Sequence, residues 1–237
     1  MGDKRKAAAE LDAAAAKKAA KRQKQKAAKL KQKRRRREVL KEDSRIVRAC
    51  TAEEQAAFFQ HACFGSLSQL EREEFPLTAA HFQRVADADQ PADPRRLALS
   101  LRPLVSANAG EAPTGSPRVI CVCQGALRAV DVARGFATLQ CGVAKLFAKH
   151  FKEAEQAEYL RSSRAKVAVG TPHRLHRLCA AGALKLDALQ LLIIDTSTDV
   201  KGLTLFDQRD LRDSFVAWYR ESLHGLVVGG QAKLCFF

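Results

Sequence analysis

No run of apolar residues in this 237-residue chain approaches the ~20 that a helix needs to cross a bilayer. The N-terminus alternates Lys and Ala without an apolar core, so it lacks the pattern of a secretory signal peptide. The seven cysteines are odd in number and form no CxxC pair, which is typical of reduced thiols in the cytosol or nucleus. The sequence therefore predicts a soluble intracellular protein without a membrane partner.

Glycine and proline are absent between Gly2 and Gly65, and no aromatic residue precedes Phe58. Residues 4–41 consist almost entirely of Ala, Lys, Arg, Gln and Glu, which are strong helix formers. They hold too few large apolar residues for a stripe that could face a core. We expect this segment to be only partly helical in solution, because like charges repel along its length.

The positive charge is concentrated at the N-terminus. Residues 1–48 hold 19 of the 41 basic and 6 of the 26 acidic residues, a net charge of +13, whereas residues 49–237 carry only +2. Two compatible interpretations of this basic arm are a nuclear import signal and a phosphate-binding segment with salt-dependent affinity. Without aromatic residues, the arm would contact the nucleic-acid backbone and not read bases. The residues of the arm predicted to bind RNA are Lys31, Lys33, Arg34, Arg35, Arg36 and Arg37.

Residues 49–117 are predicted to form a helical connecting segment. Thr51 and Glu54 have the spacing of a capping box that begins a helix. Further short helices are expected at 67–74 and 78–86, a proline-containing loop at 89–95, and a boundary at 107–117. We expect this segment to cover one side of a following sheet and to hold no chemistry.

From residue 118 onward, short apolar segments rich in β-branched residues alternate with helical patterns. The expected strands are 119–123, 142–147, 166–169, 189–194 and 234–237, and the expected helices are 126–140, 152–162, 173–181 and 215–222. This alternation predicts an α/β fold in which a parallel sheet is covered by helices on both faces. Ligands of such sheets bind outside the carboxyl ends of the strands, which here carry residues 124–128, 170–174 and 195–199.

These three segments resemble, in the same order, motifs of the first lobe of DEAD-box RNA helicases. QGALRA (124–129) stands in the place of the PTRELA motif, TPHR (171–174) is similar to TPGR, and LLIIDTST (191–198) occupies the place of the LxxDEAD strand. In that family the first two motifs contact the RNA backbone. The resemblance implies that Arg128, Thr171 and Arg174 contact phosphate.

The departures from the helicase pattern argue against an enzyme. No strand is followed by the GxxxxGK[ST] loop that binds nucleotide phosphates, and Thr196 stands where the family has its catalytic Glu. No SAT motif follows, and only one lobe of the two that form a helicase site is present. We therefore predict no catalytic residues, no nucleotide or metal cofactor and no small-molecule substrate.

Two groups of residues contain side chains that can bind metal ions, but simpler roles explain both. Asp195 and Asp199 would hold Mg²⁺ only beside a bound nucleotide, so Asp195 is expected to cap or solvate the end of its strand. His173, His176 and Cys179 do not share one face of a helix, which favours packing or solvated roles. Cys121 and Cys123 point to the same side of one strand and are predicted to fill the core.

A second resemblance is more specific. The Lys-rich arm, ALRAVDVAR (126–134), KLFAKH (145–150) and VGTPHRL (169–175) followed by an IID strand resemble the nucleolar CMS-one family, subunits of the U-three-containing 90S pre-ribosomal complex. The resemblance implies a non-catalytic, incomplete RecA-like domain at 118–237, after the connecting segment (49–117) and the arm (1–48). It also implies a nuclear and nucleolar location, with pre-ribosomal RNA, the small nucleolar RNA particle and other 90S assembly factors as partners.

Two alternatives remain open at the level of sequence. One is a residual ATPase or helicase cofactor that uses Asp195. The other is a general RNA- or chromatin-binding protein with a basic tail.

Overall fold

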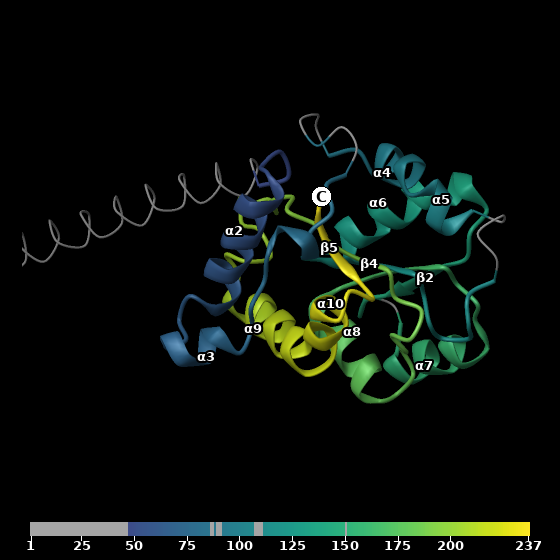
Figure 1. Ribbon diagram of the computed structural model, residues 1–237. Helices are drawn as coiled ribbons and strands as arrows, with labels where there is room; N and C mark the ends of the chain where they lie inside the picture. Colours follow the sequence, from purple (N-terminus) through teal and green to yellow (C-terminus); the bar gives the residue numbers. More distant parts are fainter. Residues whose placement is uncertain (1–46, 86–87, 89–91, 107–110, 150) are drawn as a thin grey trace, which may run out of the picture. The chain divides into compact units, whose positions relative to one another are not determined.

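The computed structural model describes residues 47–85, 88, 92–106, 111–149 and 151–237 (Figure 1). The described residues all belong to one compact unit. The predictions made for the arm, including its six RNA-binding residues, lie outside the described residues.

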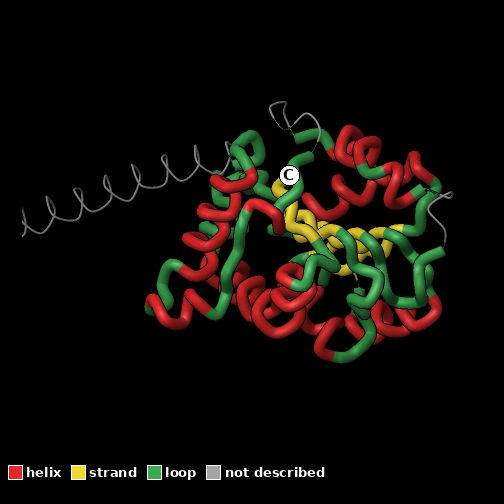
Figure 2. The backbone as a smooth tube through the Cα atoms, in the orientation of Figure 1, coloured by secondary structure: helices red, strands yellow, loops and turns green. Residues whose placement is uncertain are grey.

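The described residues contain a five-stranded sheet in the order β2-β3-β1-β4-β5, and every neighbouring pair of strands is parallel (Figure 1). The strands are β1 (Val119–Val122), β2 (Val143–Leu146), β3 (Val167–Gly170), β4 (Leu191–Ile194) and β5 (Lys233–Phe236). β1, β3 and β4 are buried along their whole length, because helices cover both faces of the sheet (Figure 2). The predicted parallel α/β sheet is confirmed.

The helices between the strands begin and end within a few residues of the predicted bounds. The exception is the last predicted helix, 215–222, because α9 already begins at Arg209. The helices are α2 (Ala52–Phe64), α3 (Gln69–Glu73), α4 (Pro94–Ser100), α5 (Arg102–Val105), α6 (Ala126–Phe136), α7 (Glu153–Ser162), α8 (Pro172–Ala180), α9 (Arg209–Trp218) and α10 (His224–Val228). Short 3₁₀ turns lie at η1 (Ala79–His81) and η3 (Ala137–Leu139), and a π-helical turn, η4 (Tyr219–Leu223), joins α9 to α10.

The capping box predicted at the start of α2 is present. The Thr51 hydroxyl accepts a hydrogen bond from the Glu54 amide at 3.3 Å, and the Glu54 carboxylate accepts one from the Thr51 amide at 2.9 Å. These two bonds satisfy amides that have no partner within the helix. Ser68 and Glu71 make the same pair of bonds at the start of α3.

The helix predicted at 78–86 is wrong beyond its first turn. After η1 the chain becomes extended at Phe82, which forms a parallel bridge with Leu234 of β5. The Gln83 amide donates to the Leu234 carbonyl at 2.7 Å. Pairing with the edge of the sheet therefore replaces the helical hydrogen bonds of this segment.

The loop predicted at 89–95 ends too late, because α4 begins at Pro94. Pro94 occupies the first turn of the helix, where a residue without an amide proton is tolerated. The Asp93 carboxylate caps this turn by accepting a hydrogen bond from the Arg95 amide at 2.9 Å. Here the proline begins a helix and does not interrupt one.

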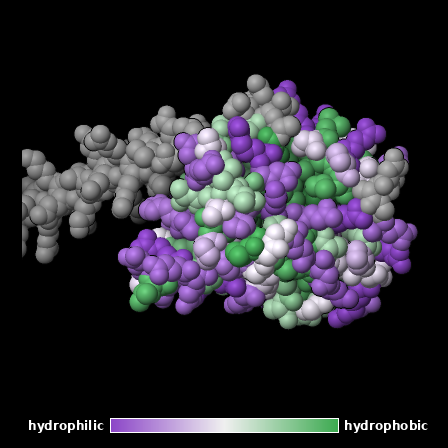
Figure 3. All heavy atoms as spheres, viewed as in Figure 1, coloured by the Kyte–Doolittle hydropathy of each residue, from purple (hydrophilic) through white to green (hydrophobic). Residues whose placement is uncertain are grey.

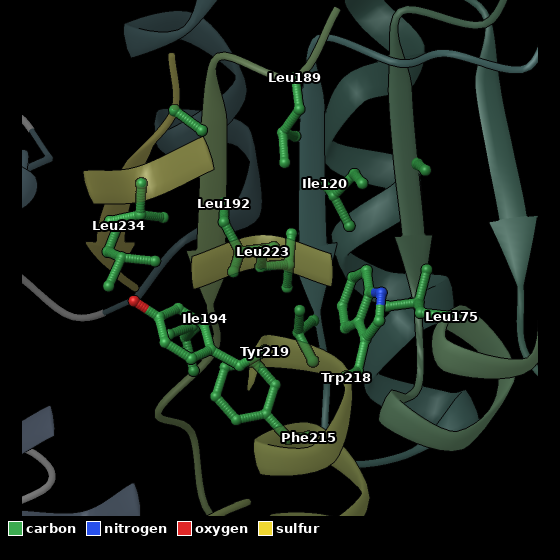
Figure 4. Close-up of a cluster of buried hydrophobic side chains, with 14 of the residues drawn as sticks. Ile120, Leu175, Leu189, Leu192, Ile194, Phe215, Trp218, Tyr219, Leu223 and Leu234 are labelled. Atoms are coloured by element: carbon green, nitrogen blue, oxygen red, sulfur yellow. The ribbon is translucent and has the colours of Figure 1, made fainter. Parts of the chain in front are cut away.

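Segment 49–117 covers both faces of the sheet, not the single face expected. On one face, Phe59 and Phe64 of α2 pack in the same cluster as Ile120 and Leu192. On the other face, Leu97 and Leu101 join a second cluster formed with alternate residues of the same strands. Figure 4 shows the first cluster, in which Phe215, Trp218 and Tyr219 fill the space under the sheet. All three side chains are fully buried.

Helices α4 and α6 pack closely at Gly135. A Cβ atom added to Gly135 would collide with the backbone carbonyl group of Pro94. We expect Gly135→Ala to lower the free energy of unfolding by about 1–3 kcal/mol, the typical cost of overpacking, despite the better helix propensity of Ala. Chemical denaturation measures this change. Gly125→Ala is the matched control, because its Cβ would meet nothing within 4 Å; equal stability of the two variants would contradict the close packing.

Candidate functional site at the carboxyl edge of the sheet

The three segments predicted to form a site lie at one edge of the sheet. β1 pairs with β3 on one side and β4 on the other, so their carboxyl ends bring 124–128, 170–174 and 195–199 together. The edge is organised by two networks of hydrogen bonds. One centres on Asp195 and the other on Arg174.

Asp195, at the end of β4, forms a bidentate ion pair with Arg128 of α6. Arg128 Nε donates to the two carboxylate oxygens at 3.2 and 3.0 Å, and Nη2 donates to Oδ1 at 2.9 Å. The side chain of Asp195 is 1% exposed and that of Arg128 is 21% exposed. The guanidinium also lies 5.3 Å from the centre of the Phe237 ring. The buried negative charge of Asp195 is therefore matched by a positive charge from the same chain.

The electrostatics of Arg128 agree with this pairing. Burial alone lowers the pKa of a guanidinium, but the hydrogen bonds and the charge of Asp195 outweigh burial, so the pKa of Arg128 is raised above its ordinary value. Arg128 thus stays charged at neutral pH. We expected Asp195 simply to cap or solvate the end of its strand. Instead, its carboxylate is buried and forms an ion pair with Arg128.

Polar side chains extend this network along the edge. Ser197 Oγ donates to Asp195 Oδ2 at 2.6 Å, and Gln124 Nε2 donates to the Ser197 carbonyl at 2.8 Å. Gln208 Nε2, at the start of α9, donates to Gln124 Oε1 at 3.1 Å. The network therefore ties the end of β1 to the loop after β4 and to α9. Sequence analysis did not identify Ser197 or Gln208.

Arg174 of α8 centres the second network. Its Nη1 donates to the Phe151 carbonyl at 3.1 Å and to Gln156 Oε1 at 2.5 Å. Gln156, on α7, in turn donates to the Lys145 and Phe147 carbonyls at 2.7 and 3.1 Å. Glu153 of α7 lies 3.8 Å from the Arg174 guanidinium. These contacts hold α7, α8 and the end of β2 together.

The three residues of this edge predicted to contact phosphate thus have different surroundings. Thr171 is half-buried, and its amide donates to the Leu146 carbonyl at 3.2 Å. Both arginines, Arg128 and Arg174, are held by groups of the same chain. Contact of the three with phosphate stays a prediction.

The candidate metal ligands make other contacts in the structure. Asp199 Oδ1 accepts hydrogen bonds from the Lys201 and Leu203 amides, both at 2.8 Å, and so shapes its own loop. His176 lies 2.7 Å from Glu221 of η4, and His173 is exposed. In the part of the chain that the structure describes, no group of three or more His, Cys, Asp or Glu side chains is placed to hold a metal ion.

Cys121 and Cys123 are buried on one face of the sheet, which confirms their predicted place in the core. Burial raises the pKa of both thiols well above the ordinary value, and it raises the pKa of Cys235 to about 12. These thiols are therefore protonated and unreactive at neutral pH.

Among the described residues, no helix is long and apolar enough to span a membrane.

The fold and the edge together define a class: a parallel α/β domain in which an arginine of the same chain pairs with the carboxylate that ends β4. Comparison with known proteins gives the family. The family model described as CMS1, U3-containing 90S pre-ribosomal complex subunit, matches residues 2–237. The chain belongs to this family, which confirms the resemblance found in the sequence.

Individual relatives match over shorter stretches. Protein CMS1 of Chaetomium thermophilum is 42% identical over 106 residues, which are 42% of this chain and 42% of the relative. Protein CMSS1 of Homo sapiens is 34% identical over 119 residues, 49% of this chain and 40% of the relative. Protein CMSS1 of Danio rerio is 31% identical over 127 residues, 52% of this chain and 44% of the relative. The chain thus spans less than half the length of these relatives.

Solved structures that are similar to this chain include DEAD-box proteins. A DEAD box protein from Methanococcus jannaschii matches 61% of this chain and 35% of its own, with 18% identity and a TM-score of 0.43. Dbp5 of S. cerevisiae, bound to RNA and ADP BeF3, matches 62% of this chain and 33% of its own, with 16% identity and a TM-score of 0.45.

Proposed function

We propose that this chain is a non-enzymatic subunit of the U3-containing 90S pre-ribosomal complex and acts early in the assembly of the small ribosomal subunit. The observation that carries the proposal is the match of the family model across residues 2–237. In this role the protein would bind pre-ribosomal RNA and other assembly factors in the nucleolus. It would act by holding a conformation of the particle and not by turnover.

The ion pair at the carboxyl edge supports a non-enzymatic role. Both carboxylate oxygens of Asp195 are occupied by Arg128, and Oδ2 also accepts from Ser197. A Mg²⁺–nucleotide complex would have to displace a bidentate, largely buried ion pair before it could reach this carboxylate. The sequence contains no phosphate-binding loop with a lysine that could offset the free energy lost by breaking this ion pair.

The basic arm supports an RNA-bound location. We propose the three-part organisation that the sequence predicts: the arm (1–48), the connecting segment (49–117) and the RecA-like part (118–237). The arm would enter the particle and contact RNA phosphates through residues 31–37, without base specificity. Its six basic residues in this stretch would also act in nuclear import.

Isolation of the tagged full chain from nucleolar extract tests membership of the particle. We expect U3 RNA and small-subunit precursor RNA to be enriched relative to an untagged control, and 90S proteins to accompany them. Recovery of U3 RNA at the level of the untagged control would refute the proposal. The arm expressed alone separates this function from general RNA binding, because a general binder would keep its RNA profile in that form.

Titration with a fluorescent ATP analogue and Mg²⁺ tests the absence of a nucleotide site. We expect no saturable binding at micromolar concentrations, because Arg128 holds Asp195 and no phosphate-binding loop is present. Micromolar binding that requires Mg²⁺ would support the residual ATPase instead. Asp195→Asn serves as the control, since any genuine site at this edge would respond to loss of the carboxylate.

A further inference from the structure

We propose that helices α4 and α5 present a second phosphate-binding surface, formed by Arg95, Arg96 and Arg102, to the backbone of structured RNA. This inference rests on the proposed function. It names a surface of the folded body, by which we mean residues 49–237, that contributes to RNA binding. The surface lies on the opposite face of the sheet from α7, α8 and α9 (Figure 1).

The charge of these two helices is of one sign. The stretch 94–105 contains three arginines and no acidic residue. All three arginines are exposed, and no carboxylate of the described residues forms an ion pair with them. Asp93, the acidic residue just before α4, caps the helix through the Arg95 amide and not through its guanidinium.

Five other exposed arginines of the body have acidic partners. These pairs are Arg134–Asp131, Arg161–Glu158, Arg164–Glu111, Arg177–Glu153 and Arg209–Asp213. The contrast matters because the body as a whole is nearly neutral. Arg72, Arg84 and Arg220 are also exposed without an ion pair among the described residues, but each guanidinium contacts a carbonyl or a ring of the chain. The stretch 94–105 groups three exposed arginines within a short segment, and such a surface attracts a polyanion.

The packing of α4 and α5 holds these arginines on a firm support. Leu97, Ala98, Leu101 and Val105 are buried against the sheet and α6. Arg95 lies on α4 and Arg102 begins α5, and both side chains are exposed. Both guanidinium groups are therefore accessible to the phosphates of a duplex backbone.

A protein partner fits this surface less well. The exposed apolar residue between the arginines is Leu99, 58% exposed, and one such residue does not make the apolar centre that protein interfaces have. On the face drawn in Figure 3, hydrophobic residues occur in small groups among hydrophilic ones. The carboxyl edge is also less suited to phosphate, since Arg128 and Arg174 are already held by the chain itself.

The test is the salt dependence of binding to a labelled RNA duplex, measured by fluorescence anisotropy with the full chain. We expect the triple variant Arg95→Gln, Arg96→Gln, Arg102→Gln to reduce the slope of log affinity against log salt by about two to three, roughly one per lost phosphate contact. The arm is identical in both proteins, so its contribution to the slope cancels. Circular dichroism establishes that the variant is folded.

A charge-matched control carries Arg161→Gln, Arg177→Gln and Arg209→Gln on the opposite face of the sheet. We expect its slope to stay within about one of the wild type. An unchanged slope in the α4–α5 variant, or equal losses in both variants, would overturn the inference. An unchanged slope accompanied by loss of 90S proteins from the isolated particle would instead show that α4 and α5 bind protein.

Failure of the inference is distinguishable from failure of the proposed function. The anisotropy measurement uses purified RNA and does not depend on ribosome assembly. If the wild-type chain failed to recover U3 RNA while the slope still fell in the variant, the surface would stand and the particle assignment would not.

Discussion

Arg128→Ala is expected to lower the free energy of unfolding by about 3–5 kcal/mol, because it leaves a buried charge without its partner. The side chain of Asp195 is 1% exposed, and Arg128 supplies three of its hydrogen bonds. Among the residues that the structure describes, only Ser197 would remain as a side-chain donor to this carboxylate. Urea denaturation followed by circular dichroism measures the change.

Two further variants give this result its meaning. Replacing both partners, Arg128→Met with Asp195→Leu, is expected to recover most of the lost stability, since no charge is then buried. Arg134→Ala, which removes an exposed arginine from an exposed pair with Asp131, is expected to change stability by less than about 0.5 kcal/mol. If Arg128→Ala cost no more than Arg134→Ala, the ion pair would not hold the edge together.

Phe59→Ala is expected to cost about 3–5 kcal/mol, the usual range for removing a buried aromatic ring. The Phe59 side chain is 0% exposed and lies on α2, within segment 49–117. Its ring packs against those of Phe64, Phe82, Phe215, Tyr219 and Phe236. The substitution therefore removes contacts among α2, α9, η4 and β5 at once.

Phe151→Ala is the matched control for Phe59→Ala. Phe151 is 42% exposed and makes a ring contact with Phe147 alone among the described residues. We expect it to cost less than about 1.5 kcal/mol, because much of the ring already faces water. If Phe59→Ala also lowered the free energy of unfolding by less than about 1.5 kcal/mol, the result would contradict a core shared between α2 and the sheet.

The sheet was predictable because its signals are local. Each strand is a short apolar segment next to turn residues, and alternation with helices requires parallel pairing. The capping box of α2 is also contained in four residues. The start of α4 was not predicted because proline and aspartate are common both in loops and in the first turn of helices. Here Asp93 and Pro94 begin a helix.

The candidate edge was predictable, but the partners within it were not. The motifs placed Arg128 and Asp195 at carboxyl ends of strands, yet the two residues are 67 positions apart. Only the pairing of β1 with β4 brings them together. An arginine six residues beyond one strand and an aspartate directly after another form a usable signal once the strand order is known. Arg174 likewise finds Gln156 through the packing of α7 on α8.

Ultraviolet crosslinking of the tagged full chain in cells, followed by sequencing of the attached RNA, tests the central claim most directly. Membership of the U3-containing 90S complex predicts discrete peaks in the small-subunit precursor RNA or in U3 RNA. The Arg95, Arg96 and Arg102 variant should lose a subset of those peaks and keep the peaks made by the arm. Crosslinks scattered over messenger RNA, without enrichment of U3 or precursor RNA, would contradict the account and leave a general RNA-binding protein.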